Sequence, residues 1–99
     1  MQMRNKDIVI KILRGLKKEI KTRFKVKGIE LFGSIVREQQ KETSDIDFLV
    51  DFEDEADLFD LVGLGLFLEK KLNQKVDVVS KRALREELRE SVLREAVTV

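Results

Sequence analysis

Apolar residues near the start of the chain recur at the spacing of an α-helix. From about Asn5 to Arg23 they lie at intervals of three and four, at Ile8, Ile12, Leu13, Leu16 and Ile20. This pattern predicts an amphipathic helix with an outer face rich in Lys and Arg. Asn5 is the expected N-cap, and Asp7 stands in the first turn, where a negative charge is favourable.

Alternating apolar and polar residues predict three strands further along the chain. The clearest covers residues 46–52, where one face is apolar and the other carries Asp45, Asp47, Leu49 and Asp51. A strand over 26–32 precedes it and ends at Gly33-Ser34. A short helix over 34–40 and a polar loop over 41–44 are expected next, and the third strand covers 75–79.

Two further helices are predicted, over residues 57–72 and 82–97. The second is indicated by apolar positions at Leu84, Leu88, Val92, Leu93 and Ala96. Alternating helices and strands predict an α/β (α+β) fold, a small sheet flanked by helices. At 99 residues, residues 1–99 are expected to form a single domain, because a second hydrophobic core would not fit.

The helix over 57–72 carries more apolar residues than one stripe can bury: Leu58, Phe59, Leu61, Val62, Leu64, Leu66, Phe67 and Leu68. The surplus indicates an exposed interface for a partner protein, with a homo-oligomer left open. The alternative is a helix enclosed by the sheet and another helix, in which case Leu66 and Phe67 would both be buried. Gly63 and Gly65 lower helix propensity but allow close helix packing.

The composition restricts the chemistry. The sequence has no Cys and no His, which excludes thiolate nucleophiles, Cys zinc sites and Ser-His-Asp triads. Its 20 Lys+Arg nearly balance 19 Asp+Glu, so charge gives nucleic-acid binding no support. No signal-peptide pattern is present and no apolar run reaches the roughly 20 residues that span a bilayer, so a cytoplasmic protein without a membrane contact is expected.

Asp45 and Asp47 form the first part of a candidate site. Carboxylates at i and i+2 on a strand project from one face, roughly 6–7 Å apart along the chain. Hard oxygen ligands of this kind suit Mg²⁺, which takes further oxygens from a triphosphate. The alternative for an Asp-x-Asp sequence is a solvated acidic edge.

Gly33 and Ser34 form the second part. Gly33 has no Cβ, so a phosphate can approach the backbone closely. Ser34 would open the short helix, where unpaired N–H groups and the helix dipole favour an anion. Arg37 lies one turn further on and could reach the same phosphates. The alternatives are an ordinary turn for Gly33-Ser34 and a solvated side chain for Arg37.

Asp77 is a lone acid in the apolar strand Val76-Asp77-Val78-Val79. If this strand lies beside the second one, Asp77 joins Asp45 and Asp47 as a third carboxylate, either as a general base or in a metal site. The alternative is an Asp at a strand end that faces water.

Together these residues give a more specific pattern. Gly33-Ser34-x₁₀-Asp45-x-Asp47 resembles the signature of the DNA polymerase β nucleotidyltransferase superfamily. The stretches 31–37 and 44–50, with the later 75–79 and 93–97, are similar to its minimal nucleotidyltransferase (MNT) branch. The resemblance implies a polymerase β-like core with a small mixed sheet of about three or four strands.

It also implies a set of functional residues. Asp45, Asp47 and Asp77 would be catalytic and hold Mg²⁺, and ATP would be the substrate. Gly33, Ser34 and Arg37, with Ser44 directly before the acidic pair, would bind the nucleotide. Many members act as antitoxins of HEPN-domain toxins, and some adenylylate a Tyr of the toxin. Family members often have a Gly directly after the Arg, whereas this sequence has Glu38. An acidic side chain at this position is expected to alter the affinity for triphosphate.

The expected function is therefore Mg-dependent transfer of AMP, or another NMP, to a hydroxyl on a partner protein, with a HEPN-type toxin as that partner. The sequence has no Tyr, so a tyrosine acceptor would lie on the partner. One alternative is a binding module that neutralises a toxin by contact alone. Transfer to RNA or a small molecule is a weaker alternative. Arginines of the last predicted helix are expected to form i,i+4 surface pairs with its glutamates rather than contact nucleotide.

Overall fold

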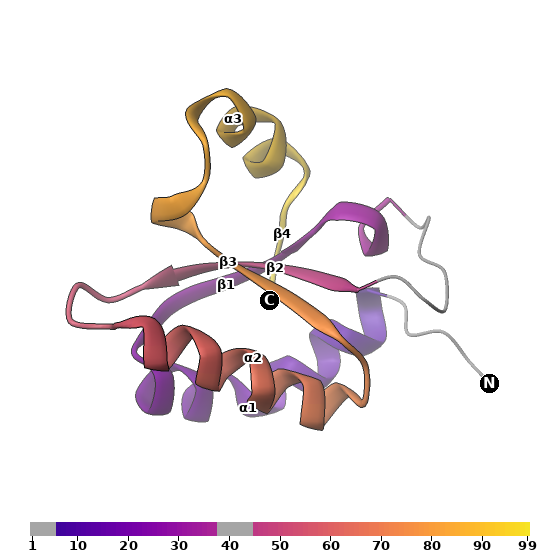
Figure 1. The fold of residues 1–99 in the computed structure, drawn as a ribbon. Coiled ribbons are helices and arrows are strands. Elements are labelled where there is room, and N and C mark those ends of the chain that lie inside the picture. The colour runs from indigo at the N-terminus through magenta and orange to yellow at the C-terminus, as the bar shows by residue number, and fades with distance from the viewer. Residues whose placement is uncertain (1–5, 38–44) are drawn as a thin grey trace.

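A four-stranded sheet with strand order β3-β2-β1-β4 lies at the centre of the structure, a computed structural model that describes residues 6–37 and 45–99 (Figure 1). The strands are β1 (Val26–Phe32), β2 (Ile46–Phe52), β3 (Val76–Ser80) and β4 (Val97–Thr98). Strand β1 runs antiparallel to both of its neighbours, whereas β2 and β3 are parallel. The expectation of a small mixed sheet flanked by helices is thus confirmed.

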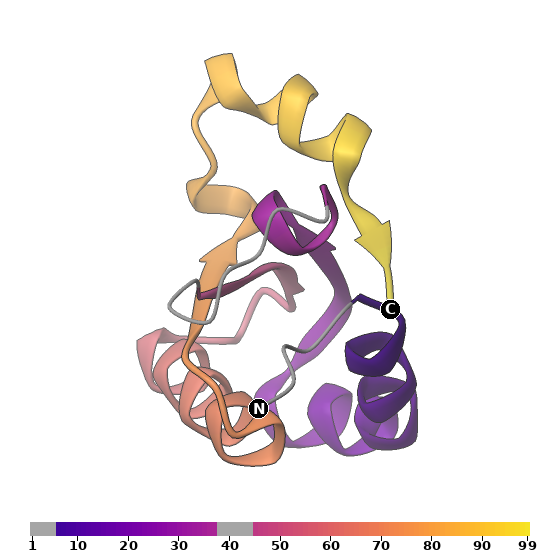
Figure 2. The same cartoon turned by 90° about the vertical axis from the view of Figure 1, so that its right-hand side faces the viewer.

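The helices divide unequally between the two faces of the sheet. Helices α1 (Lys6–Phe24) and α2 (Leu58–Leu72) lie side by side against one face, and α3 (Glu86–Glu95) stands beyond the other (Figures 1 and 2). Helix α2 connects β2 to β3, because two parallel strands cannot be joined by a tight turn and need a crossover.

The main core lies between the sheet and the α1–α2 layer. Apolar side chains of β2 that point toward these helices are almost completely buried: Ile46, Phe48, Val50 and Phe52. They pack with residues such as Leu13 of α1 and Leu68 of α2. Leu49, on the opposite face of β2, is also buried, at 1% exposure. The polar residues of β2 on that second face therefore lie beside a surface that is partly shielded from solvent.

Helix α2 has well-defined ends. The Asp57 side chain accepts a hydrogen bond from the Asp60 N–H, and the Asp60 side chain accepts one from the Asp57 N–H, which forms a capping box. At the other end Asn73 adopts the left-handed conformation with φ 53°, which Asn tolerates better than most residues. Because Asp57 is the cap and not the first helical residue, the helix begins one residue later than the predicted range of 57–72.

Close contact between α1 and α2 depends on Gly63. A Cβ at this position would lie 3.2 Å from Cε1 of Phe24, tighter than usual. The Phe24 ring in turn packs on Phe67 with a centroid distance of 5.3 Å. The expectation that this glycine permits close helix packing is confirmed.

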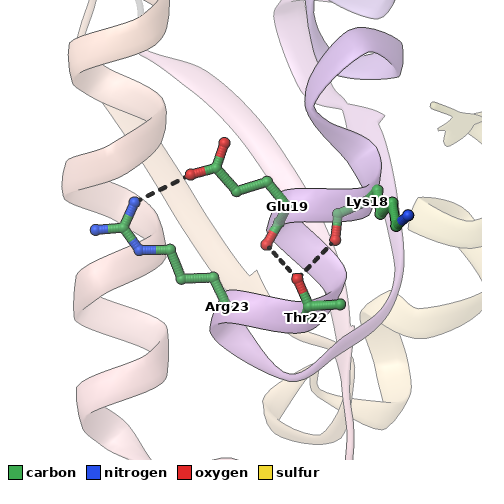
Figure 3. A network of polar contacts seen from close by, with 4 residues as sticks. All are labelled: Lys18, Glu19, Thr22 and Arg23. Carbon is green, nitrogen blue, oxygen red and sulfur yellow. Dashed lines mark hydrogen bonds and ion pairs between the residues drawn. The ribbon is translucent and has the colours of Figure 1, made fainter.

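Polar contacts between neighbouring residues stabilise the last turns of α1 (Figure 3). The Thr22 hydroxyl donates to the backbone carbonyl of Lys18 at 2.9 Å, and Arg23 forms an ion pair with Glu19 at 3.1 Å. The Arg23 guanidinium also lies over the ring of Phe67, 5.5 Å from its centroid. The first two contacts lie within α1, and the contact of Arg23 with Phe67 joins the exposed end of α1 to α2.

Four apolar residues of α2 remain exposed, and we call them the α2 stripe: Leu58, Phe59, Val62 and Leu66. Leu66 is 63% exposed, whereas its neighbour Phe67 is buried. The helix is therefore not enclosed on all sides, and the alternative of complete burial is wrong. Whether a partner covers the α2 stripe stays a prediction.

The end of the chain differs from its prediction. In place of one helix over 82–97 there is a 3₁₀ turn (Lys81–Ala83), then α3, then β4. No residue of α3 is buried, so its apolar spacing reflects a surface helix rather than one packed on the sheet. Strand β4 was missed because two residues carry no periodicity, and only pairing with Glu30 and Leu31 of β1 makes them a strand.

Other boundaries agree more closely with expectation. Strands β1 and β2 have the predicted limits, and β3 is shifted by one residue. Of the short helix over 34–40, the structure shows a 3₁₀ turn over Gly33–Ile35. Residues 38–40 and Asn5, the expected N-cap of α1, lie outside the described residues. None of the helices described is long and apolar enough to cross a membrane.

Candidate nucleotidyl-transfer site

Asp47 and Asp77 lie opposite one another on adjacent strands. In the parallel pairing of β2 with β3 their Cα positions are register partners. Paired residues project from the same face of a sheet, so this arrangement brings the third predicted acid beside the second. Asp45 directly precedes β2 and is exposed, as is Asp77, whereas Asp47 is half-buried.

Gly33 lies directly against Asp47. It has φ +79°, a conformation that L side chains rarely adopt. A Cβ there would lie 3.2 Å from Cγ of Asp47 and would overlap its Oδ2. Both the backbone conformation and the available space therefore require glycine, and this requirement places the predicted phosphate loop in contact with the predicted metal ligand.

The electrostatics of Asp47 show that the three acids influence one another. Burial is the largest cause, and together with the nearby negative charges of Asp77 and Asp45 it raises the pKa of the Asp47 carboxyl from 3.8 to about 6. The positive charge of Arg37 opposes the shift. A carboxylate whose ionisation is disfavoured in this way would gain from a cation placed beside it.

Arg37 and Gly33 both donate to one carboxylate, that of Glu95 at the end of α3. The Gly33 N–H donates to Oε1 at 2.9 Å. The Arg37 Nη1 donates to Oε1 at 2.9 Å and to Oε2 at 3.1 Å. Two groups predicted to bind phosphate are thus joined, and each is paired with an anionic side chain.

Glu95 was not predicted as a site residue. The sequence favoured i,i+4 surface pairing for the glutamates of this region, and Glu90 does pair with Arg94 in that way. Glu95 instead reaches across the structure to Arg37, and Arg82 pairs with Asp54. Two features of the sequence set Glu95 apart: its place in the stretch 93–97, which resembles the MNT branch, and the lack of a Lys or Arg three or four positions away.

Ser34 lies in the 3₁₀ turn and is half-buried. The helix expected to begin there is a single turn within the described residues, so the argument from a helix dipole is wrong for this part of the chain. Backbone N–H groups and the Ser34 hydroxyl remain as donors. Ser44 and Glu38 lie outside the described residues.

The donor set agrees with Mg²⁺ in kind. Asp47 and Asp77, with Asp45 beside them, offer the hard oxygen ligands that Mg²⁺ prefers. Across residues 6–37 and 45–99, no three His, Cys, Asp or Glu side chains converge into a complete metal-binding group. Mg²⁺ commonly uses only one or two carboxylates, with water and substrate phosphates as its other ligands, so these residues fit it as partial ligands.

Sequence comparison places the chain beside proteins of known family. Residues 13–99 match the nucleotidyltransferase domain family. The protein adenylyltransferase MntA of Thermococcus cleftensis is 42% identical over 99 residues, covering 100% of both chains.

Two solved structures share the fold. A toxin–antitoxin complex with AMP-PNP matches 91% of this chain and 70% of its own, with a TM-score of 0.71 and 30% identity. A Shewanella oneidensis complex of a tri-AMPylated HEPN toxin with an MNT antitoxin matches 91% of this chain and 66% of its own. Its TM-score is 0.62 and its identity 28%.

Proposed function

The chain belongs to the nucleotidyltransferase domain family, and from this premise we propose that it transfers AMP from ATP to a hydroxyl group of a HEPN-type toxin. We further propose that residues 1–99 act as a single domain and that the protein works in the cytoplasm. The AMP-PNP complex and the AMPylated toxin of its structural relatives support the choice of nucleotide and acceptor.

One observation carries the proposal: the contact of Gly33 with Asp47, whose register partner is Asp77. A phosphate held at the Gly33 loop would lie beside Asp47, and an acceptor hydroxyl at the exposed Asp77 would lie one strand further on. In-line transfer needs the triphosphate and the acceptor at neighbouring positions of this kind.

In the proposed reaction the acceptor hydroxyl attacks the α-phosphorus of ATP. A phosphorus–oxygen bond forms to the acceptor, the bond to the leaving pyrophosphate breaks, and Asp77 takes the hydroxyl proton. Gly33, Ser34, Arg37 and Ser44 hold the triphosphate through N–H, hydroxyl and guanidinium donors.

Asp45, Asp47 and Asp77 are the residues that would hold Mg²⁺. When bound, Mg²⁺ neutralises charge on the phosphates and on the carboxylates that surround it. The raised pKa of Asp47, caused by burial and by its acidic neighbours, supports a cation at this position. Asp47 would then be ionised near neutral pH, as a ligand must be.

The test is intact-mass spectrometry of the protein encoded by the neighbouring gene, after incubation with this chain, ATP and Mg²⁺. Mass increments of whole AMP groups are expected with the native chain. They should disappear with Asp47→Ala and persist with Asp51→Asn, which changes a carboxylate further along the same face of β2. Increments that persist with Asp47→Ala would contradict the proposed role of Asp47.

Neutralisation by contact alone is a second candidate, favoured by the exposed α2 stripe. A binding module of this kind would not depend on the acidic residues. Co-purification of the partner with the Asp47→Ala chain, combined with undiminished protection of cells from the toxin, would support it. Loss of protection despite a stable complex would support transfer instead.

A further inference from the structure

The Glu95 carboxylate accepts hydrogen bonds from two donors of the proposed nucleotide site, the Gly33 N–H and the Arg37 guanidinium. We propose that Glu95 is an internal substitute for a phosphate group, which a bound triphosphate must displace and which thereby sets nucleotide affinity. This inference rests on the proposed function, because it takes the Gly33 loop as the place where phosphates bind.

The geometry supports a substitute for phosphate rather than an ordinary surface pair. One oxygen, Oε1, accepts from both Gly33 and Arg37, each at 2.9 Å, and Oε2 accepts from Arg37 at 3.1 Å. Phosphate oxygens use the same combination of a backbone N–H and a guanidinium. Two anions cannot use these donors at once without strong repulsion, so binding at the loop requires exchange.

The position of Glu95 is imposed by the strand that follows it. Strand β4 pairs with Glu30 and Leu31 of β1, and the Val99 N–H donates to the carbonyl of Ile29 at 3.1 Å. This pairing fixes the end of α3 beside the end of β1, where Gly33 begins the next turn. The carboxylate therefore approaches the loop from a fixed direction, and exchange requires its side chain to swing away.

The contact of Glu95 with Gly33 and Arg37 also helps to hold α3 in place. No residue of α3 is buried, and the helix stands apart from the α1–α2 layer (Figures 1 and 2). Glu95 is thus a major attachment of the helix to the body of the protein, beside a bond from Arg89 to the Lys81 carbonyl. Displacement of Glu95 by a triphosphate should loosen α3, so nucleotide binding is communicated to this exposed helix.

The first test compares nucleotide affinity by calorimetric titration with AMP-PNP and Mg²⁺. Glu95→Gln keeps the shape of the side chain and removes its charge, so AMP-PNP should bind about five- to tenfold more tightly than to the native chain. Glu90→Gln is the matched control, because Glu90 is exposed on the same helix and pairs with Arg94. The control should bind like the native chain. Equal or weaker binding by Glu95→Gln would overturn the inference.

Hydrogen exchange of α3 amides provides the second test. Saturating AMP-PNP should reduce the protection of α3 in the native chain, and Glu95→Gln should show reduced protection before any nucleotide is added. Unchanged protection in both experiments would overturn the proposed coupling.

Failure of the proposed function gives a different result from failure of this inference. Tight binding of AMP-PNP without AMP transfer to a partner would contradict the function and leave the Glu95 comparison valid. No binding by either the native chain or Glu95→Gln would contradict both.

Discussion

Asp47 and Asp77 are register partners on the parallel strands β2 and β3, although α2 separates them in sequence. Their surroundings differ: Asp47 is half-buried against Gly33, and Asp77 is exposed on the edge strand. The pair therefore places one carboxylate beside the phosphate loop and one where an acceptor from outside can reach it. This asymmetry leads to separate expectations for the two residues.

Asp77→Asn should slow AMP transfer by about 10²–10⁴-fold, the usual contribution of a general base. Affinity for AMP-PNP measured without Mg²⁺ should change little, because Asp77 lies on β3, on the far side of β2 from the strand that leads into Gly33. The measurement is the rate of AMP incorporation into the partner under saturating ATP. Asp51→Asn serves as the control on β2, and equal rates for the two variants would show that Asp77 accepts no proton.

Gly33→Ala should lower the free energy of unfolding by about 1–3 kcal/mol, because alanine is strained at φ +79° and its Cβ would overlap the Asp47 carboxylate. Gly28→Ala is the matched control. A Cβ at Gly28 would have nothing within 4 Å, so this change should alter stability by less than about 1 kcal/mol. Denaturant titration distinguishes the two, and equal effects would contradict the conformational requirement at Gly33.

The raised pKa of Asp47 predicts a pH dependence of stability without divalent cations. In the folded state the pKa of Asp47 is about 6, above the ordinary value of 3.8. Asp47 therefore keeps its proton in the folded chain at pH values where the unfolded chain has lost it. The resulting stabilisation is complete below pH 3.8 and is lost as the pH rises through 6. Because Asp47 is only half-buried, we expect a loss of about 1 kcal/mol.

Asp47→Asn should remove this component. The measurement is the free energy of unfolding at a series of pH values in a chelator, for the native chain and for Asp47→Asn. Other acids titrate in both proteins, so the difference between the curves isolates Asp47. Parallel curves between pH 4 and 7 would show that its pKa is not raised.

The α2 stripe should bind the partner protein. Phe59→Ser and Val62→Ser should each weaken the complex by about tenfold or more, as expected for apolar residues near the centre of an interface. Both side chains are exposed, at 86% and 53%, so stability should change by no more than about 0.5 kcal/mol. Binding is measured by calorimetry with the purified partner, and Lys70→Ser is the control on α2. Full affinity in both apolar variants would place the interface elsewhere.

The sequence was most informative where local pattern and tertiary packing agree. The alternation of apolar and polar residues along β2 matches the burial of Phe48 and Val50. The limits of β1 and β2 were each predicted from the residue pattern of the strand itself. The pairing of Asp47 with Asp77 was predicted only conditionally, since sequence alone does not fix strand order. The family resemblance supplied the combination of acids, and the register then brought two of them together.

Contacts between distant residues could not be derived in the same way. Glu95 joins Gly33 across 62 positions and Arg37 across 58. Glu90 pairs with Arg94 within its own helix, whereas Glu95 has no Lys or Arg three or four positions away, and that absence does not say which distant residue it contacts. Strand β4 was missed for the same physical reason, because its two residues form a strand only through β1.

The crossover through α2 also has a consequence for how activity appears during folding. The β1–β2 pair is antiparallel and joins nearby segments, whereas β2–β3 pairing closes the longer loop through α2 and is expected to form more slowly. Asp77 should therefore reach Asp47 late, after the Gly33 loop has already formed. Regained transfer activity would then follow β2–β3 pairing during refolding, and a chain with only its first hairpin in place would transfer nothing.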